Sequence, residues 1–205
     1  MTQPSVAQRV FGHQHRAMEE KFIVGVGGEK AGGKETLVKI LLRQYAHLIT
    51  VVSSSNLLLQ MLTDRQWSAD RDDYRKLFES EAARHGEDWL TKYMDVAVRE
   101  ARTPVVFWDS IRMPADFVKV QSYPHQLTVY VTASAKNRHE RAMARNQKGE
   151  GDITLEQFLA QEAASNERFV PILGPQMAER IDNDGTREEF EVAVRNFWKE
   201  VRIPS

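Results

Sequence analysis

The sequence predicts an α/β protein of three layers, in which a parallel β-sheet lies between two layers of helices. Short apolar runs alternate along the chain with longer segments of helical periodicity, as in a sheet built from β-α-β units. One of these runs, Val105 to Trp108, is continuously apolar, which is typical of a parallel strand covered on both faces. The length of 205 residues fits one such domain.

Composition and charge exclude several classes of protein. The chain has 28 Lys and Arg against 29 Asp and Glu, so a net charge of -1 gives no overall attraction to nucleic acid or anionic lipid. It contains no cysteine, which is typical of a reducing compartment. It shows neither a signal-peptide pattern nor an apolar run of about 18 residues. We therefore expect a cytoplasmic protein with no nucleic-acid and no membrane partner, of open oligomeric state.

The first quarter of the chain predicts an arm, a strand, a helix and a second strand. Residues 1–20 are polar and predict an N-terminal arm. Phe22 to Gly27 is a short apolar run that predicts a strand, and apolar residues within 36–46 fall at helical spacing. Leu48 to Val52 predicts the next strand, and the polar residues 53–56 that follow suit a turn and a helix N-cap.

The remaining chain continues the alternation of helices and strands. The segment at about 55–101 predicts two or three helices, and residues 105–109 and 127–132 predict strands. Residues 136–168 read as a helix, a glycine-containing tip and a returning helix, and the glycines permit hinge motion. Residues 180–182 predict a last short strand.

A turn and a helix end the pattern. Asn183 to Gly185 predicts the turn, and Thr186 with Glu189 forms a capping box for a final helix. A single domain is therefore expected over residues 21–205.

A glycine-rich loop carries the sharpest functional signal. Residues 28–36 fit the phosphate-binding pattern G-x-x-x-x-G-K between a predicted strand and a predicted helix. Glycines let backbone N–H groups converge on phosphate oxygens, and the helix N-terminus adds its positive end. Lys34 is expected to reach the β- and γ-phosphates of a nucleotide. The cofactor-binding residues predicted in this loop are Gly28, Glu29, Lys30, Ala31, Gly32, Gly33, Lys34, Glu35 and Thr36.

The position after Lys34 departs from the usual pattern. Glu35 stands where a Ser or Thr hydroxyl usually binds magnesium, and Thr36 follows one place later. Glu35 either reaches a metal ion through water or is an acidic first-turn residue favoured by the helix dipole. Thr36 and Asp109 are the candidate metal-binding residues, and the chemistry of phosphoryl transfer makes ATP and Mg²⁺ the expected cofactors.

Two polar residues follow the buried strand at 105–109. Asp109 ends this strand at the edge where open α/β sheets bind ligands, and Arg112 lies three positions on. Asp109 is expected to accept a proton from an acceptor, to orient it or to hold magnesium through water, and Arg112 to stabilise transferring charge. The alternative for Asp109 is a helix N-cap without a chemical role.

Three arginines between residues 136 and 168 share a predicted helical face. Arg138, Arg141 and Arg145 stand at i, i+3 and i+7, so a helix would align them. Such a row neutralises phosphates, and the alternative is a solvated basic face.

These motifs together resemble the P-loop nucleoside- and nucleotide-kinase group. The ending Gly33-Lys34-Glu35-Thr36 is similar to the loops of deoxynucleoside monophosphate kinases and dephospho-coenzyme A kinase-like proteins. The apolar strand followed by Asp-x-x-Arg at 109–112 and the turn at 183–186 are also similar to that family's patterns. The resemblance implies a P-loop kinase fold with an acceptor-covering helical insertion at about 55–101 and a lid at about 136–168.

The resemblance also implies roles for individual residues. Arg141 and Arg145 match the lid arginines, and Gly185 and Thr186 match the turn near the adenine. Ser53 or Ser55 fits the serine that contacts the acceptor, whereas Leu59 stands at the position of the acceptor arginine. Residues of the helical insertion are candidates to replace that arginine, namely Arg71, Tyr74 and Arg84.

The expected activity is phosphoryl transfer from ATP to a small nucleotide-type acceptor. The first candidate acceptor is a nucleoside or deoxynucleoside monophosphate, and the second is the ribose 3′-hydroxyl of dephospho-coenzyme A. A P-loop nucleotide switch that binds without transfer is the alternative from another class, because Glu35 and Leu59 depart from the kinase pattern. Catalytic roles are predicted for Lys34, Asp109, Arg112, Arg141 and Arg145, and acceptor binding for Ser53, Ser55, Arg71, Arg84, Asp109 and Arg112.

Overall fold

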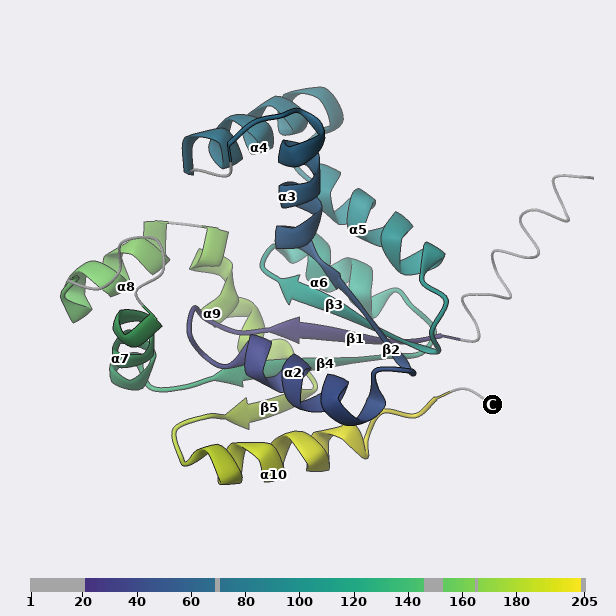
Figure 1. Ribbon diagram of the computed structural model, residues 1–205, viewed down its shortest axis with the longest axis vertical. Coiled ribbons are helices and arrows are strands. Elements are labelled where there is room, and N and C mark those ends of the chain that lie inside the picture. Colours follow the sequence, from purple (N-terminus) through teal and green to yellow (C-terminus); the bar gives the residue numbers. More distant parts are fainter. Residues whose placement is uncertain (1–20, 69–70, 146–152, 165, 204–205) are drawn as a thin grey trace, which may run out of the picture.

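The computed structural model describes residues 21–68, 71–145, 153–164 and 166–203. The predicted arm at 1–20 and the predicted lid tip lie outside the described residues. Within them, parallel strands form one sheet in the order β2-β3-β1-β4-β5 (Figure 1). The strands are β1 Phe22–Gly27, β2 Ile49–Ser53, β3 Val105–Ile111, β4 Gln126–Thr132 and β5 Glu179–Asp182.

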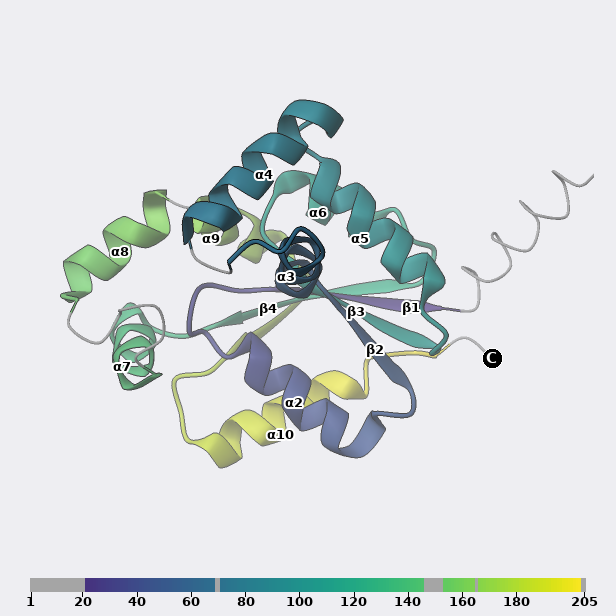
Figure 2. The same cartoon turned by 45° about the horizontal axis from the view of Figure 1, so that its top comes forward.

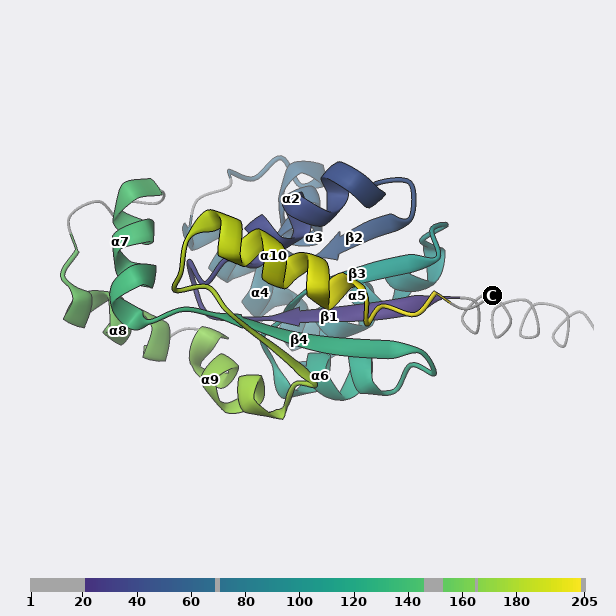
Figure 3. The same cartoon turned by 90° about the horizontal axis from the view of Figure 1, so that it is seen from below.

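Two layers of helices cover the sheet, so the three-layer prediction is confirmed. Helices α2 Lys34–Tyr45 and α10 Arg187–Trp198 pack on one face through residues such as Leu37, Leu41 and Phe190. Helices α5 Trp89–Glu100, α6 Pro114–Gln121 and α9 Val170–Leu173 pack on the other face. Figure 3 shows the sheet between these two layers. Burial of apolar side chains on both faces gives the fold most of its stability.

Two pairs of helices extend beyond the carboxyl edge of the sheet. Helices α3 Ser54–Asp64 and α4 Arg71–His85 rise from the end of β2, as Figure 2 shows. Helices α7 Ala135–Arg145 and α8 Leu155–Ala164 follow β4 and lie where the strand arrows of Figure 1 point. The first pair falls within about residues 55–101 and the second within about 136–168, and the roles of these segments as an acceptor cover and a lid stay predictions. Helix α5, also within the insertion, belongs to the core instead, because Met94 and Val98 are buried against the sheet.

The structure adds elements that the sequence reading omits. Helix α6 begins at Pro114, and the Asp116 carboxylate accepts hydrogen bonds from the backbone N–H groups of Arg112 and Met113. Proline at the first helical position and an acidic first turn are ordinary helix-start signals. Strand β3 runs two residues past Asp109, and short helical turns, η2 Asn166–Phe169 and η3 Gly174–Gln176, flank α9.

In the part of the chain that the structure describes, each helix is too short or too polar to cross a lipid bilayer.

Candidate active site

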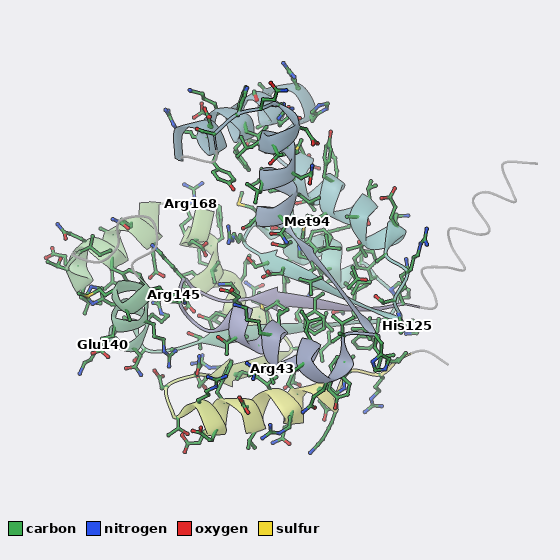
Figure 4. The ribbon with its side chains drawn as sticks, viewed as in Figure 1. Arg43, Met94, His125, Glu140, Arg145 and Arg168 are labelled. Atoms are coloured by element: carbon green, nitrogen blue, oxygen red, sulfur yellow. The ribbon has the colours of Figure 1, made fainter. Side chains whose placement is uncertain are left out.

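A cavity of about 1090 Å³ opens at the carboxyl edge of the sheet. The phosphate loop, the ends of β2 and β3, helix α7 and the turn after β5 line it. Among its described lining residues, eight are Lys or Arg and four are Asp or Glu. Arg43 of α2 and Arg145 of α7 are two of these cations and are labelled in Figure 4. This excess of positive charge favours an anionic ligand.

Two loop glycines have backbone conformations that other residues rarely adopt. Gly28 has φ 154°, and a Cβ added there would lie 2.1 Å from the carbonyl oxygen of Val131. Gly33 has φ 120°, and a Cβ there would lie 2.4 Å from Nδ2 of Asn183. Glycine is therefore required at both ends of the loop, because a side chain would push the loop away from β4 and β5.

Lys34 folds back onto the loop that carries it. Its Nζ donates to the carbonyl oxygens of Gly28 and Glu29, the latter at 2.9 Å. Burial lowers the pKa of Lys34, and the nearby carboxylates of Glu167 and Asp109 oppose that shift. A bound phosphate would add negative charge and so favour the ammonium form.

The turn after β5 is fastened to the loop. The buried side chain of Asn183 donates to the carbonyl oxygen of Gly32 at 3.0 Å, and the backbone carbonyl oxygen of Asn183 accepts from Arg141 Nη2 at 2.6 Å. Asp184 accepts from the backbone N–H of Ser134 at 2.7 Å, which holds the pKa of Asp184 below its usual value. Gly185 completes this wall of the cavity.

Asp109 lies on the floor of the cavity, between β1 and β2. It pairs in register with Val26 of β1 and Ser53 of β2. Burial raises the pKa of Asp109, and the positive charges of Lys34 and Arg112 oppose that shift. The carboxylate is therefore placed to accept a proton or to contact a cation.

Arg112 reaches back to the same floor. Its Nε donates to Ser110 Oγ at 3.0 Å and lies 3.3 Å from Glu167 Oε1. The side chain is 35% exposed and lines the cavity. It is a cation that the segment directly after β3 brings to the site.

The three lid arginines do not form one row toward the cavity. Arg141 and Arg145 line it, and Arg145 lies 3.9 Å from Glu35. Arg138 is buried instead, where it donates to Glu162 of α8 and to the carbonyl oxygens of Ala133 and Lys30. Seven residues make almost two full turns of a helix, so spacing alone would place Arg138 and Arg145 on about the same face. Arg138 is drawn into the interior because it pairs there with Glu162 of α8.

Helix α8 contacts the phosphate loop through an aromatic ring. The Phe158 ring is fully buried, with Lys30 Nζ at 5.4 Å and the Arg138 guanidinium at 5.7 Å from its centroid. These cation–π contacts join the lid, the loop and α7.

Several predicted residues lie together and others do not. Ser53, Ser55, Glu35 and Thr36 line the cavity, with all of the loop from Glu29 onward. Thr186 caps α10 through its hydroxyl and is absent from the described lining. Arg84 also lies outside that lining, because it is 3.8 Å from Glu81 on α4. Arg71 begins α4, and its side chain lies outside the described atoms.

Several residues in or beside the cavity were not predicted from the sequence, among them Tyr130, Asn56, Glu167 and Arg187. Glu29 accepts a hydrogen bond from Tyr130, and burial with this bond raises the pKa of Tyr130 to about 12. Asn56, Glu167 and Arg187 also line the cavity. No motif spacing marks them, because each reaches the cavity from a separate element.

The oxygen donors of the cavity suit Mg²⁺ held together with a nucleotide. Asp109 and Thr36 both line it. Within the described ranges, no cluster of three or more His, Cys, Asp or Glu is arranged to hold a metal ion. Mg²⁺ in kinases takes one or two protein ligands and completes its shell with phosphates and water, so this donor set fits it. Glu35 pairs with Lys39 at 2.5 Å on the exposed side of α2, which favours the first-turn interpretation.

No protein-family model and no curated protein matches the sequence. Three solved structures share the fold. TT1252 from Thermus thermophilus is 20% identical with a TM-score of 0.51, covering 89% of this chain and 99% of its own. An uncharacterized protein from Eubacterium ventriosum ATCC 27560 is 12% identical with a TM-score of 0.55, covering 88% and 98%. Shikimate kinase from Bacteroides thetaiotaomicron is 15% identical with a TM-score of 0.55, covering 87% and 96%.

At these identities the likeness establishes the fold. The chain has a P-loop kinase-like fold with a parallel sheet and helices on both faces, and its structural neighbours include a kinase.

Proposed function

We propose that this protein is a kinase that transfers the γ-phosphoryl group of ATP to a nucleoside or deoxynucleoside monophosphate. The observation that carries the proposal is the convergence of Lys34, Asp109, Arg112 and Arg141 on one cavity. These side chains come from α2, β3, the segment after β3, and α7. Positioned cations around two aligned substrates are the main requirement of phosphoryl transfer.

Each residue has a role that follows from its place. The backbone of the phosphate loop and Lys34 hold the β- and γ-phosphates, and Arg141 and Arg145 neutralise charge from the lid side. Arg112 binds the acceptor phosphate, and Ser53 and Ser55 lie on the same side near β2. An acceptor phosphate oxygen forms the new bond to the γ-phosphorus as the bond to the β-γ bridging oxygen breaks.

Mg²⁺ would be held at Asp109 and Thr36 together with the phosphates. When bound, it supplies positive charge to the transferring phosphoryl group. Asp109 and Thr36 provide the oxygen atoms for the metal at that end of the cavity, while the loop backbone holds the nucleotide.

A phosphorylated acceptor is supported by size and charge. A cavity of about 1090 Å³ exceeds the usual upper range for one small ligand, which is about 1000 Å³. The lining carries four more cations than carboxylates, and ATP together with its Mg²⁺ offsets only part of this excess, which leaves positive charge for an acceptor phosphate.

A second candidate acceptor is the 3′-hydroxyl of dephospho-coenzyme A. Asp109 favours it, because a buried carboxylate with a raised pKa can accept the proton that a hydroxyl must lose. A phosphate acceptor needs no such base.

The test is ADP release from Mg·ATP across a panel of acceptors. The panel holds nucleoside and deoxynucleoside monophosphates, dephospho-coenzyme A and, because a structural neighbour is named for it, shikimate. We expect one monophosphate to raise turnover well above the rate without acceptor. Stimulation by dephospho-coenzyme A would select the second candidate. Equal hydrolysis with every acceptor would overturn transfer and support a nucleotide switch.

A further inference from the structure

A carboxylate from the lid segment lies against the acceptor-side arginine. Glu167 belongs to η2, directly after α8. Its Oε1 lies 3.3 Å from Arg112 Nε, and both side chains line the cavity. The acceptor role of Arg112 is part of the proposed function, and the inference below rests on it.

The same carboxylate also influences Lys34. Among the charges that oppose the lowered pKa of Lys34, Glu167 has the largest effect, ahead of Asp109 and Glu29. Glu167 therefore acts electrostatically on both Arg112 and Lys34, two cations that phosphates would contact. A carboxylate on a guanidinium makes charge-assisted hydrogen bonds of the kind that a phosphate oxygen makes.

Ion pairs with Arg138 and Arg112 tether the described residues of α8 and η2, and these pairs differ in how easily a ligand can reach them. The Arg138–Glu162 pair is buried, with side chains 8% and 13% exposed. The Arg112–Glu167 pair is 35% and 19% exposed and borders the cavity. Separating the first pair would leave charges in the interior, whereas a ligand entering the cavity can replace the second.

We propose that Glu167 is a specificity-determining residue. Its carboxylate binds Arg112 where the phosphate monoester of an acceptor would bind, and only a ligand that carries such a group displaces it. A phosphate dianion on the acceptor offers Arg112 more negative charge than the single carboxylate does. A neutral hydroxyl offers none and leaves the pair intact. The pair therefore selects phosphorylated acceptors over their unphosphorylated counterparts.

Binding of inorganic phosphate, measured by isothermal titration calorimetry on the full chain, tests this without knowledge of the acceptor. Glu167→Gln removes the competing charge and should tighten phosphate binding roughly three- to tenfold, the scale of a partly exposed ion pair. Glu167→Ala should give the same gain. Glu167→Asp keeps the carboxylate and should bind as the wild type does. Glu156→Gln, an exposed change on α8, is the matched control for net charge.

A double-mutant cycle assigns the gain to Arg112. In the Arg112→Ala background, Glu167→Gln should bring no gain, because the cation that it releases is gone. A gain that persists in this background would overturn the proposal, since the carboxylate would then act on Lys34 or on the field of the cavity. Weaker phosphate binding by Glu167→Gln would also overturn it, because Glu167 would then only brace Arg112.

The outcome is separable from that of the proposed function. If no acceptor is phosphorylated but the Arg112-dependent gain appears, the kinase proposal fails and the role of Glu167 stands. If a monophosphate is phosphorylated and no gain in phosphate binding appears, the kinase proposal stands and the proposed role of Glu167 fails. With an active enzyme, Glu167→Gln should also lower the KM for that monophosphate while kcat changes little.

Discussion

The side-chain amide of Asn183 donates to the carbonyl oxygen of Gly32 at 3.0 Å, joining the turn after β5 to the phosphate loop. The backbone N–H of Asn183 donates to Thr132 at the end of β4, and its carbonyl oxygen accepts from Arg141 of α7. One buried residue thus connects the end of β5, the phosphate loop and helix α7. Hydrogen bonds therefore hold the phosphate loop to the turn after β5.

Replacing Asn183 should loosen this connection. Asn183→Ala leaves the Gly32 carbonyl without that donor, which should cost about 1–3 kcal/mol of unfolding free energy. Urea denaturation followed by circular dichroism measures the loss. Asn196→Ala, an exposed change on α10, is the control and should stay within about 0.5 kcal/mol. Equal losses in the two variants would contradict this role of Asn183.

Removing the buried guanidinium of Arg138 should destabilise the protein strongly. Arg138→Met deprives Glu162 of this partner in a largely buried place, so a loss of about 3 kcal/mol is expected. Arg180→Met breaks an exposed pair with Asp182 and should cost less than about 1 kcal/mol. Thermal unfolding of both variants checks the difference, and a smaller loss for Arg138→Met than for Arg180→Met would count against the buried tether.

The buried carboxylate of Asp109 should lower the unfolding free energy of the protein, although turnover needs it. Its pKa is raised in the folded state, so between the unfolded and folded pKa values the native protein binds more protons and stability falls as pH rises. Above that window the cost is complete. Asp109→Asn should therefore raise the unfolding free energy at pH 7 by about 1 kcal/mol, with a smaller gain near pH 4, while turnover falls.

The control for this change is Asp64→Asn, an exposed substitution at the end of α3. Urea midpoints at both pH values provide the comparison. A lower midpoint for Asp109→Asn than for the wild type at pH 7 would contradict the expectation that burial of the charged Asp109 carboxylate destabilises the protein.

Arg141 should contribute to ATP binding. Arg141→Gln removes a charge-assisted donor at the cavity wall, and a rise of roughly 10- to 100-fold in the Kd for ATP is expected. Lys136→Gln removes a charge from the exposed side of the same helix and should change the Kd by less than about twofold. Fluorescence titration with a labelled ATP analogue distinguishes them. Similar small changes in the Kd for ATP in both variants would show that Arg141 has a structural role and does not bind ATP.

Much of the fold was predictable because its signals are local. The phosphate loop between β1 and α2, the apolar run of β3 and the capping box of Thr186 and Glu189 each lie within a few residues. Helical spacing also placed α7 correctly. The same spacing did not show which way Arg138 points, because that depends on Glu162 in another helix.

The unpredicted part of the site depends on contacts between distant segments. Asn183 lies 151 residues from Gly32, and Glu167 reaches Arg112 from a short turn with no motif of its own. Such pairs are set by how the strands order in the sheet. The residue types alone carry no record of that order.

The most direct test follows the label of γ-³²P-ATP into product, in the wild type and in Lys34→Ala. Lys199→Ala, an exposed change after α10, is the matched control. The account predicts acceptor-dependent transfer of the label to a nucleoside monophosphate, a loss of at least about 100-fold in Lys34→Ala, and full activity in Lys199→Ala. Label released only as inorganic phosphate with every acceptor, or transfer unchanged in Lys34→Ala, would contradict it.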